Sequence, residues 1–436
     1  MDHGGITMER RTVKEYLPFY IFALYLFLVA IFMGDFRTIP EGLKAIIWAN
    51  DILITDYVGL AGIAASFTNA ALVTLFSAEL LRIANIPLKG KAIFVIGLMS
   101  GFALFGKNIF NMWPIMLGAF INCKVRKVKF GTVVIPGLLA AAIGPIVSTL
   151  FFYPGYLDPK WMAIGLIVGI IIGYVAPILS AHTATLLHGM SLYNLGFTVG
   201  LIALVIVPVF KSYGVVFSTD TIWATEYNFS LGVLMYVTCA VFIIIGIIMD
   251  KENAIKNFFN ILKRPGNPAD DFCDLDGFGA VMVNIGINGI VATSYLLLIG
   301  GHINGATVGA IFTVMGFGGQ GKHAKNIIPI MIGVAVGGLT KQWSITAPGS
   351  QFAAMFGTTL APIAGTYGII PGIIAGFLHS SVVQNAGLGY SGANLYNNGY
   401  CAGLLCIVMF VVLREVIKKP NTYSEPSPSM IKKEDK

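Results

Sequence analysis

The sequence is poor in charge and in cysteine. Only 11% of its 436 residues are Asp, Glu, Lys or Arg, whereas an ordinary soluble domain has about 25%. Hydrophobic residues make up 56%, so the composition excludes a soluble enzyme and a disordered chain. The five cysteines form no C-x-x-C pair and show no metal-ligand spacing with histidine, which excludes a disulfide scaffold. No nucleophile elbow, P-loop or dinucleotide fingerprint occurs in a credible context, and we expect neither an enzyme nor a bound cofactor or metal.

What the sequence does contain is a series of long apolar runs. They recur from Tyr16 to Leu413 with no soluble block between them, which predicts an all-α integral membrane protein. A hydrocarbon layer is about 30 Å thick and needs about 20 apolar residues to cross it. Ten runs are long enough: residues 17–34, 58–81, 131–153, 161–180, 184–210, 229–249, 277–300, 349–366, 368–383 and 395–413.

Two pairs of shorter apolar runs, 92–105 with 108–123 and 306–320 with 324–339, are each broken by a polar Gly-Lys step. A helix of about 15 residues reaches only about 22 Å, which is too short for a full crossing. We therefore expect two re-entrant helical hairpins. Polar backbone at that depth is tolerated only where it is buried in protein or lines an aqueous cavity, which makes the two hairpin tips functional candidates.

The distribution of charge predicts an orientation. With the N-terminus inside, 20 Lys and Arg residues fall on the cytoplasmic side and 5 on the other side, as the positive-inside rule expects. We therefore expect a multi-pass protein of the cell inner (plasma) membrane with both termini cytoplasmic. The formal net charge of +7 belongs to these loops, so nucleic acid is not an expected partner.

The strongest signal is an internal repeat. Residues 101–118, GFALFGKNIFNMWPIMLG, align without a gap to 316–333, GFGGQGKHAKNIIPIMIG, with nine of eighteen positions identical. A second block, GMSLYNLGFTVGL at 189–201, matches GANLYNNGYCAGL at 392–404 at seven of thirteen positions. An odd number of crossings separates the two units, which predicts repeats of inverted topology, as in transporters and channels. The predicted organisation is an N-terminal segment with the first transmembrane helix (1–57), repeat 1 (58–210), a connecting helix and cytoplasmic loop (211–276), repeat 2 (277–414) and a disordered cytoplasmic tail (415–436).

Each hairpin tip reads Gly-Lys-x-x-x-Asn-x-x-Pro. A helix start presents free N–H groups and a partial positive charge, and Lys107 or Lys322 adds a full charge beside it. Ionisable residues inside a membrane are costly and functional by default, and the alternative is that both lysines snorkel to headgroups or water. The helix starts are expected to have an asparagine as the cap and a proline in the first turn: Asn111 with Pro114, and Asn326 with Pro329.

Acidic residues are almost absent from the apolar segments. None occurs between Gly277 and Arg414, and Glu79 is the only carboxylate expected inside the membrane, with Arg82 as its helical partner. Because cation-coupled carriers commonly use buried carboxylates, the sequence favours a small anion or a neutral polar solute. For the asparagines and tyrosines along this route, the alternative role is an interhelical hydrogen bond worth about 0.6 kcal/mol. The further candidate contacts are Asn69, Asn284, Tyr193, Asn194, Tyr396, Asn397 and His323.

The tip sequence GKNIFNMWPIMLG and its second copy resemble an uncharacterised bacterial family of polytopic membrane proteins that carries a domain of unknown function, over nearly the whole chain. The Leu-Tyr-Asn blocks, 189–201 and 392–404, are similar to the Gly-x-x-x-Tyr-Asn stretch of urea transporters, an inverted-repeat channel family with re-entrant helices. The urea-transporter signature Leu-Pro-x-x-Thr-x-Pro-Phe is absent. A related architecture serves flavin-carrying subunits of redox complexes, although DTIWAT at 220–225 lacks the expected Ser/Thr-Gly-Ala-Thr ending.

The sequence therefore predicts a permease or channel that passes a small anionic or neutral polar solute between the two hairpin tips. In this hypothesis Lys107 and Lys322 attract the solute, and Asn111 and Asn326 shape the half-helix ends. The alternative is a membrane subunit of a redox or enzyme complex. The expected partners are a small-molecule solute and the lipid bilayer, and assembly into a homo-oligomer is left open.

Overall fold

The computed structural model describes residues 11–217 and 220–417, and its regular structure is helical. The prediction of an all-α membrane protein is confirmed, because nine segments within these residues are long and apolar enough to cross a bilayer. The predicted disordered tail lies outside the described residues from position 418 onward. The nine segments are α1 (Val13–Met33), α3 (Tyr57–Ile83), α6 to α7 (Phe130–Phe151), α8 (Pro159–Leu186), α9 (Asn194–Ser212), α10 (Asn228–Asp250), α13 (Phe278–Leu298), α18 with η5 (Ile369–Tyr390) and α19 (Asn397–Ile417).

The tenth predicted crossing, residues 349–366, is broken into three pieces. It forms α16 (Pro348–Gly357), η4 (Thr358–Leu360) and α17 (Ala361–Tyr367). Pro362 stands at the start of α17, where its missing N–H and fixed backbone angle begin a new helix but cannot continue an old one. The prediction of ten continuous crossings was therefore wrong at this segment. The helix from Phe130 is interrupted in the same way, between α6 (Phe130–Ala140) and α7 (Gly144–Phe151).

Four short apolar helices lie where the hairpins were predicted. The first tip joins α4 (Gly90–Phe102) to α5 (Trp113–Val125). The second tip joins α14 (Gly305–Gly316), continued by η3 (Phe317–Gly319), to α15 (Ala324–Thr340). At 13 residues each, α4 and α5 extend only about 20 Å. The other described helices are η1 (Phe36–Thr38), α2 (Ile39–Trp48), η2 (Ala141–Ile143), α11 (Glu252–Ile261) and α12 (Phe272–Asp276).

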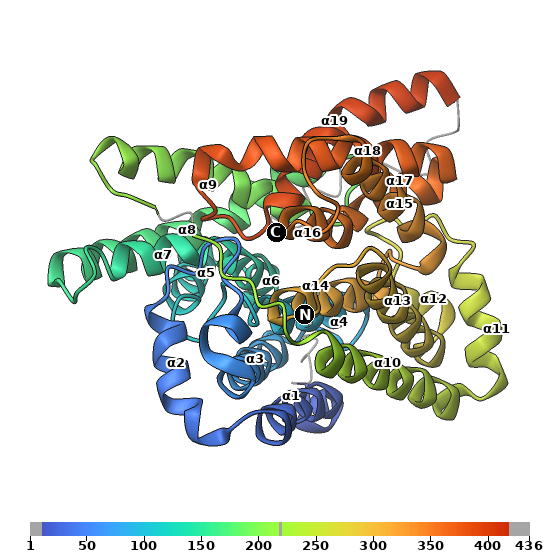
Figure 1. Cartoon of the computed structure of the whole chain (residues 1–436), viewed down its shortest axis with the longest axis horizontal. Helices are drawn as coiled ribbons and strands as arrows, with labels where there is room; N and C mark the ends of the chain where they lie inside the picture. The colour runs from blue at the N-terminus through green and yellow to red at the C-terminus, as the bar shows by residue number, and fades with distance from the viewer. Residues whose placement is uncertain (1–10, 218–219, 418–436) are drawn as a thin grey trace, which may run out of the picture.

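Equivalent helices pack in the same way in the first half (residues 13–212) and the second half (residues 228–417). In the first half α1 packs on α3 and α5 packs on α8, while in the second half α10 packs on α13 and α15 packs on α18. Between the halves, α4 contacts α14 and α9 contacts α19. Figure 1 shows α4 and α14 near the centre of the molecule, with α1 and α10 toward one edge and α9 and α19 toward the opposite edge.

Glycine allows the halves to meet backbone to backbone. A Cβ atom added at Gly97 would lie 2.7 Å from the Cα of Gly316, and one added at Gly196 would lie 2.9 Å from the Cα of Gly399. These approaches fall at the α4–α14 and α9–α19 contacts, where any side chain would force the helices apart. The 51 glycines thus include the small-residue contact positions that close helix packing in a membrane requires.

The segment between α10 and α13, predicted as a polar loop, packs against the second tip. The ring nitrogen Nε2 of His323 lies 3.0 Å from the carbonyl oxygen of Arg264, and the side-chain amide of Gln320 donates to the carbonyl of Pro268. The guanidinium of Arg264 also pairs with Asp276 at 2.6 Å, and this hydrogen-bonded pair raises the pKa of the guanidinium. The segment therefore forms part of the wall around the second tip.

Candidate functional site

The two predicted tip lysines are completely buried. Each follows a glycine in the left-handed region, Gly106 (φ 88°) before Lys107 and Gly321 (φ 92°) before Lys322. Only glycine adopts this conformation without strain, which explains why a Gly-Lys step forms each tip. The side chains of Lys107 and Lys322 have 0% exposure, so neither reaches the protein surface as a snorkelling lysine does.

Each lysine reaches a tyrosine of the other half. The Nζ atom of Lys107 donates to the hydroxyl of Tyr396 at 2.7 Å and lies 3.3 Å from the sulfur of Met99. The Nζ atom of Lys322 donates to the hydroxyls of Tyr193 at 2.6 Å and Thr358 at 2.7 Å.

Aromatic rings complete the surroundings of both ammonium groups. Lys107 lies over the rings of Phe102 and Tyr396, and Lys322 lies over those of Phe317 and Tyr193, a favourable cation–π arrangement. Among the described residues, no carboxylate forms an ion pair with either lysine.

Two predicted asparagines hold the tips in shape. Asn69 donates its Nδ2 to the carbonyls of Ala103 (2.7 Å) and Lys107 (2.9 Å). Asn284 does the same 215 positions later, with the carbonyls of Gly318 and Lys322, both at 2.8 Å. These bonds satisfy backbone groups that the broken helices leave free. Both asparagines thus act as supports of the tip.

The prediction that Asn111 and Asn326 cap the returning helices was wrong. The cap positions belong to Met112 before α5 and to His323 before α15. The two asparagines instead close the tip, since Asn111 donates to the carbonyl of Gly106 at 3.0 Å and Asn326 to that of Gly321 at 2.8 Å. The sequence spacing alone could not separate the cap from the residue just before it, which Asn111 is, or from the residue three positions after it, which Asn326 is. Pro114 lies in the first turn of α5 as predicted, whereas Pro329 lies inside α15.

A carboxylate that the sequence reading missed is buried beside the first tip. Asp51 has 0% exposure, and its Oδ2 accepts hydrogen bonds from Asn108 (2.8 Å), Asn111 (3.0 Å) and Ser148 (2.6 Å). At the second tip the residue 215 positions later is Gly266, where a Cβ would lie 2.5 Å from the Nδ2 of Asn326. Asp51 lies in the short segment between α2 and α3. No signal in the sequence alone separates a buried aspartate there from one in an exposed loop.

Glu79 is therefore not the only acidic residue in the apolar region. Asp51 and Asp56 are both fully buried, while the side chain of Glu79 is 40% exposed. The predicted pairing of Glu79 with Arg82 is confirmed at 2.5 Å.

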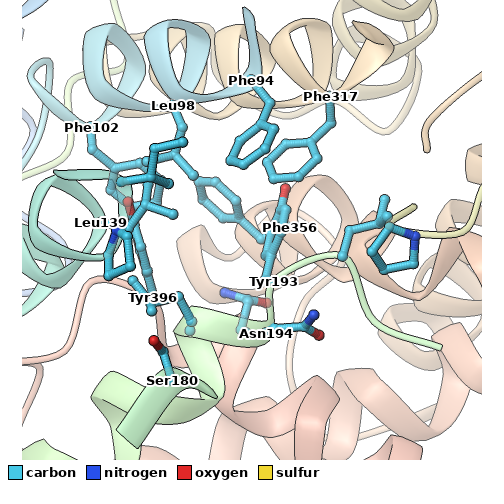
Figure 2. A pocket seen from close by; sticks show the side chains of 18 of the residues that line it. Phe94, Leu98, Phe102, Leu139, Ser180, Tyr193, Asn194, Phe317, Phe356 and Tyr396 are labelled. Carbon is cyan, nitrogen blue, oxygen red and sulfur yellow. The ribbon is translucent and has the colours of Figure 1, made fainter. Parts of the chain in front are cut away.

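A cavity of about 280 Å³ lies where the two halves meet. Figure 2 shows Phe94, Leu98, Phe102 and Phe317 along one side, with Ser180 and Asn194 on the opposite side. Tyr193 and Tyr396, whose hydroxyls bind the tip lysines, both line it. Its other lining residues are Lys91, Ile135, Pro136, Leu139, Leu192, Leu195, Gly196, Pro268, Gln320, Phe356, Leu395, Asn398 and Gly399.

Few of the predicted site residues line this cavity. Tyr193, Tyr396 and Asn194 do, and the Oδ1 of Asn194 has no hydrogen-bond partner among the described residues. Asn397 lies outside the lining, and its neighbour Asn398, which was not predicted, takes its place. Lys107 and Lys322 do not line the cavity but contact its wall through the hydroxyls of Tyr396 and Tyr193. The other predicted residues are buried outside the lining: Asn111, Asn326, Asn69, Asn284 and His323.

The walls are more apolar than the amide-rich pathway predicted from the sequence. Phenylalanine, leucine and isoleucine supply ten of the 21 lining residues, and the polar groups are few and come from tyrosine, asparagine, serine, glutamine and one lysine, Lys91. Ligand cavities commonly have this composition, with a few polar groups that fix the orientation of an otherwise apolar molecule.

The fold and the cavity define a multi-pass, all-helical membrane protein. The chain belongs to the family described as "Protein of unknown function (DUF1576)", which matches residues 36–212 and 250–415. The predicted membership of such a family is therefore confirmed. The two matched segments begin earlier than the predicted repeats, which started at 58 and 277. No curated protein and no solved structure matches the chain significantly, so the likeness to urea transporters stays a prediction.

Proposed function

We propose that the protein is a membrane permease or channel for a small solute, and that the cavity at the junction of the halves is part of the pathway. The supporting observation is the position of this cavity. Residues of both halves line it, and Tyr193 and Tyr396 join its wall directly to the two interrupted-helix tips. Transporter sites commonly lie near the bilayer midplane between repeats, at the ends of discontinuous helices.

The lining favours a solute with a hydrogen-bond acceptor or an anionic group and an apolar remainder. Each tyrosine hydroxyl accepts a hydrogen bond from a buried lysine, so its own O–H remains available to donate. A carboxylate or a carbonyl group suits such a donor, and the nearby positive charges favour the carboxylate. The phenylalanine and leucine walls suit the apolar part. This proposal narrows the sequence prediction of a small anionic or neutral polar solute.

The repeated contacts support an inverted-repeat architecture. Hydrogen bonds at the first tip recur 215 positions later. Counting α6 to α7 and α16 to α17 as crossings gives five in each half, an odd number that places the halves in opposite orientations. We place the protein in the plasma membrane. By the positive-inside rule, both of its termini then lie in the cytoplasm.

Flux into liposomes tests the proposal. Purified full-length protein is reconstituted and assayed with small carboxylates of increasing apolar length and with neutral amides. We expect saturable uptake of at least one carboxylate above protein-free liposomes. The variant Tyr193→Phe plus Tyr396→Phe removes both hydroxyl donors, each worth about 1 kcal/mol or more, so we expect at least a tenfold loss of flux.

A matched control uses a tyrosine away from the cavity. Tyr236 bonds Ser294 at the protein surface, and Tyr236→Phe should keep normal flux. Absence of flux for every solute would contradict the proposal. Flavin absorbance in that same inactive preparation would favour the redox-complex alternative.

A further inference from the structure

Part of the cavity's lining reaches the surface of the molecule. This part includes the exposed side chain of Lys91 and the partly exposed side chains of Ile135, Pro136, Ser180 and Pro268. We call this part the first mouth. The innermost lining, around Tyr193 and Tyr396, is buried.

Matching contacts identify the equivalent of each mouth residue in the other half. The hydrogen bonds of Asn69 and Asn284 match each other. They show that each residue in the first tip and its flanking segments corresponds to the residue 215 positions later. The bond from Leu395 N to Ala142 O matches that from Leu192 N to Thr359 O. Residues of α6 and α7 therefore correspond to residues of α16 and α17 that lie 217 positions later. Carbonyl contacts of Gly118 with Ile170 and of Gly333 with Ile373 relate α8 to α18 by 203 positions.

The equivalent positions are closed by aromatic packing. The equivalents of Gln320, Ile135 and Leu139 are Phe105, Phe352 and Phe356, which we call the aromatic gate. Ring centroids in the gate are 5.1 Å apart for Phe105 with Phe352, 6.2 Å for Phe105 with Phe356 and 5.1 Å for Phe352 with Phe356. All three side chains are at most 2% exposed.

One backbone hydrogen bond on the closed side has no counterpart at the first mouth. Leu53 donates its N–H to the carbonyl of Gly392 at 2.8 Å. The equivalent of Leu53 is Pro268, which has no N–H to donate. One face is therefore sealed by side chains and by a backbone bond, and the pseudo-symmetric positions on the other face are open.

Residues 220–227, which lead into α10, cross the closed side. Figure 1 shows the start of α10 near the middle of the molecule. Ile222 exchanges backbone hydrogen bonds with Ile54 and Asp56, both at 3.0 Å, and Ala224 O accepts from Asn304 at 2.9 Å. The ring of Trp223 lies 5.8 Å from that of Phe352, so this segment holds the aromatic gate from outside.

We propose that the protein is an alternating-access carrier, and that the aromatic gate is the closed form of a second mouth equivalent to the first. This inference rests on the proposed transport function. In the other state Phe105 and Phe352 separate, while Gln320, Ile135 and Leu139 close together over the tyrosines. Two halves with equivalent contacts can exchange conformations in this way, and only one mouth is open at a time. A channel would open both.

Single-cysteine labelling tests the proposal without measuring flux. In a chain whose five native cysteines are replaced, Ser180→Cys reports the first mouth. Its equivalent, Val383→Cys, is buried at 7% exposure and reports the second. Ala353→Cys, on α16, is a second reporter of that mouth and changes side-chain volume little. A membrane-impermeant maleimide is applied to intact cells and, separately, to inside-out vesicles.

We expect Ser180→Cys to react from one face and Val383→Cys and Ala353→Cys from the opposite face, at a rate at least tenfold lower. The change Phe105→Ala plus Phe352→Ala weakens the gate. It should raise the rate at Val383→Cys and lower the rate at Ser180→Cys. A matched control, Phe151→Ala, removes a ring from a different aromatic cluster and should change neither rate.

Three outcomes would overturn the proposal: reaction of both reporters from one face, no reaction of either second-mouth reporter in folded protein, or a faster Val383→Cys reaction with an unchanged rate at Ser180→Cys. The third outcome is the one expected of a channel, in which the second mouth opens while the first mouth stays open. Alternating labelling in a protein that carries no solute would overturn the transport function and leave the two-state inference standing. Solute flux without alternating labelling would overturn the two-state inference and leave the transport function standing.

Discussion

The ammonium group of Lys107 lies 2.7 Å from the hydroxyl of Tyr396, a residue 289 positions later in the chain. The reciprocal contact joins Lys322 to Tyr193 at 2.6 Å. Each tip is therefore fastened to the start of α9 or α19 in the other half. The same hydroxyls line the cavity, so the contacts that hold the halves together also form the candidate binding surface.

This double role allows stability and transport to be separated. In Lys107→Met plus Tyr396→Phe both partners become apolar, and replacing both partners of a buried hydrogen bond by apolar groups of similar shape can be nearly neutral or even stabilising. We expect the melting temperature in detergent to stay within a few degrees while carboxylate flux falls at least tenfold. Lys107→Met alone leaves the hydroxyl without its donor and should melt lower than the double variant. Full flux in the double variant would remove this lysine from the mechanism.

Asp51 is expected to be essential for the stability of the first tip. Asp51→Ala leaves the amides of Asn108 and Asn111 and the hydroxyl of Ser148 without their acceptor. The loss of three buried hydrogen bonds, with their donors left unsatisfied, should cost roughly 3–5 kcal/mol. Asp158→Ala, which removes only the cap of α8, should cost about 1 kcal/mol. Thermal unfolding of both variants in detergent checks this order, and equal melting temperatures would contradict it.

Patterns that repeat along the chain were predictable from the sequence. The apolar runs gave eight of the nine spanning segments close to their observed bounds, because burial in lipid requires uninterrupted hydrophobicity. The Gly-Lys steps located both tips, because a left-handed glycine is needed there. The features that could not be predicted depend on contacts between residues that are far apart in the sequence. Asp51 lies near position 111 only in space, and nothing local showed that the lysines point toward tyrosines and away from solvent.

The cavity could be predicted only in part for the same reason. Three candidates from the Tyr-Asn blocks, Tyr193, Asn194 and Tyr396, line the cavity. Whether Asn397 or Asn398 lines it depends on the rotation of α19, which no sequence pattern fixes. The aromatic lining of Phe94, Phe317 and Phe356 could not be distinguished from ordinary apolar helix surface.

Asn69 and Asn284 should make similar contributions to stability. Each donates two hydrogen bonds to tip carbonyls, and alanine at either position leaves those buried carbonyls unsatisfied. We expect Asn69→Ala and Asn284→Ala each to lower the free energy of unfolding by roughly 1–3 kcal/mol. Asn385→Ala removes an amide on an exposed position of α18 and should have little effect. A large loss from one tip asparagine and none from the other would show that the tips are not equivalent.

Glycine at the helix contacts should be intolerant of even one methyl group. A Cβ at Gly173 would lie 1.8 Å from the carbonyl oxygen of Ile115, and one at Gly376 would lie 2.1 Å from that of Ile330. Gly173→Ala must therefore move α8 away from α5, and overpacking of this kind costs roughly 1–3 kcal/mol or more.

The control for this prediction is Gly232→Ala in α10, where an added Cβ meets nothing within 4 Å. Alanine is the better helix former by about 1 kcal/mol, so this variant should be neutral or slightly more stable. Thermal melting of the two variants in the same detergent should therefore shift in opposite directions. If Gly173→Ala melts at or above the parent temperature, the close α5–α8 approach is not required by the folded protein, and glycine at this position has another cause.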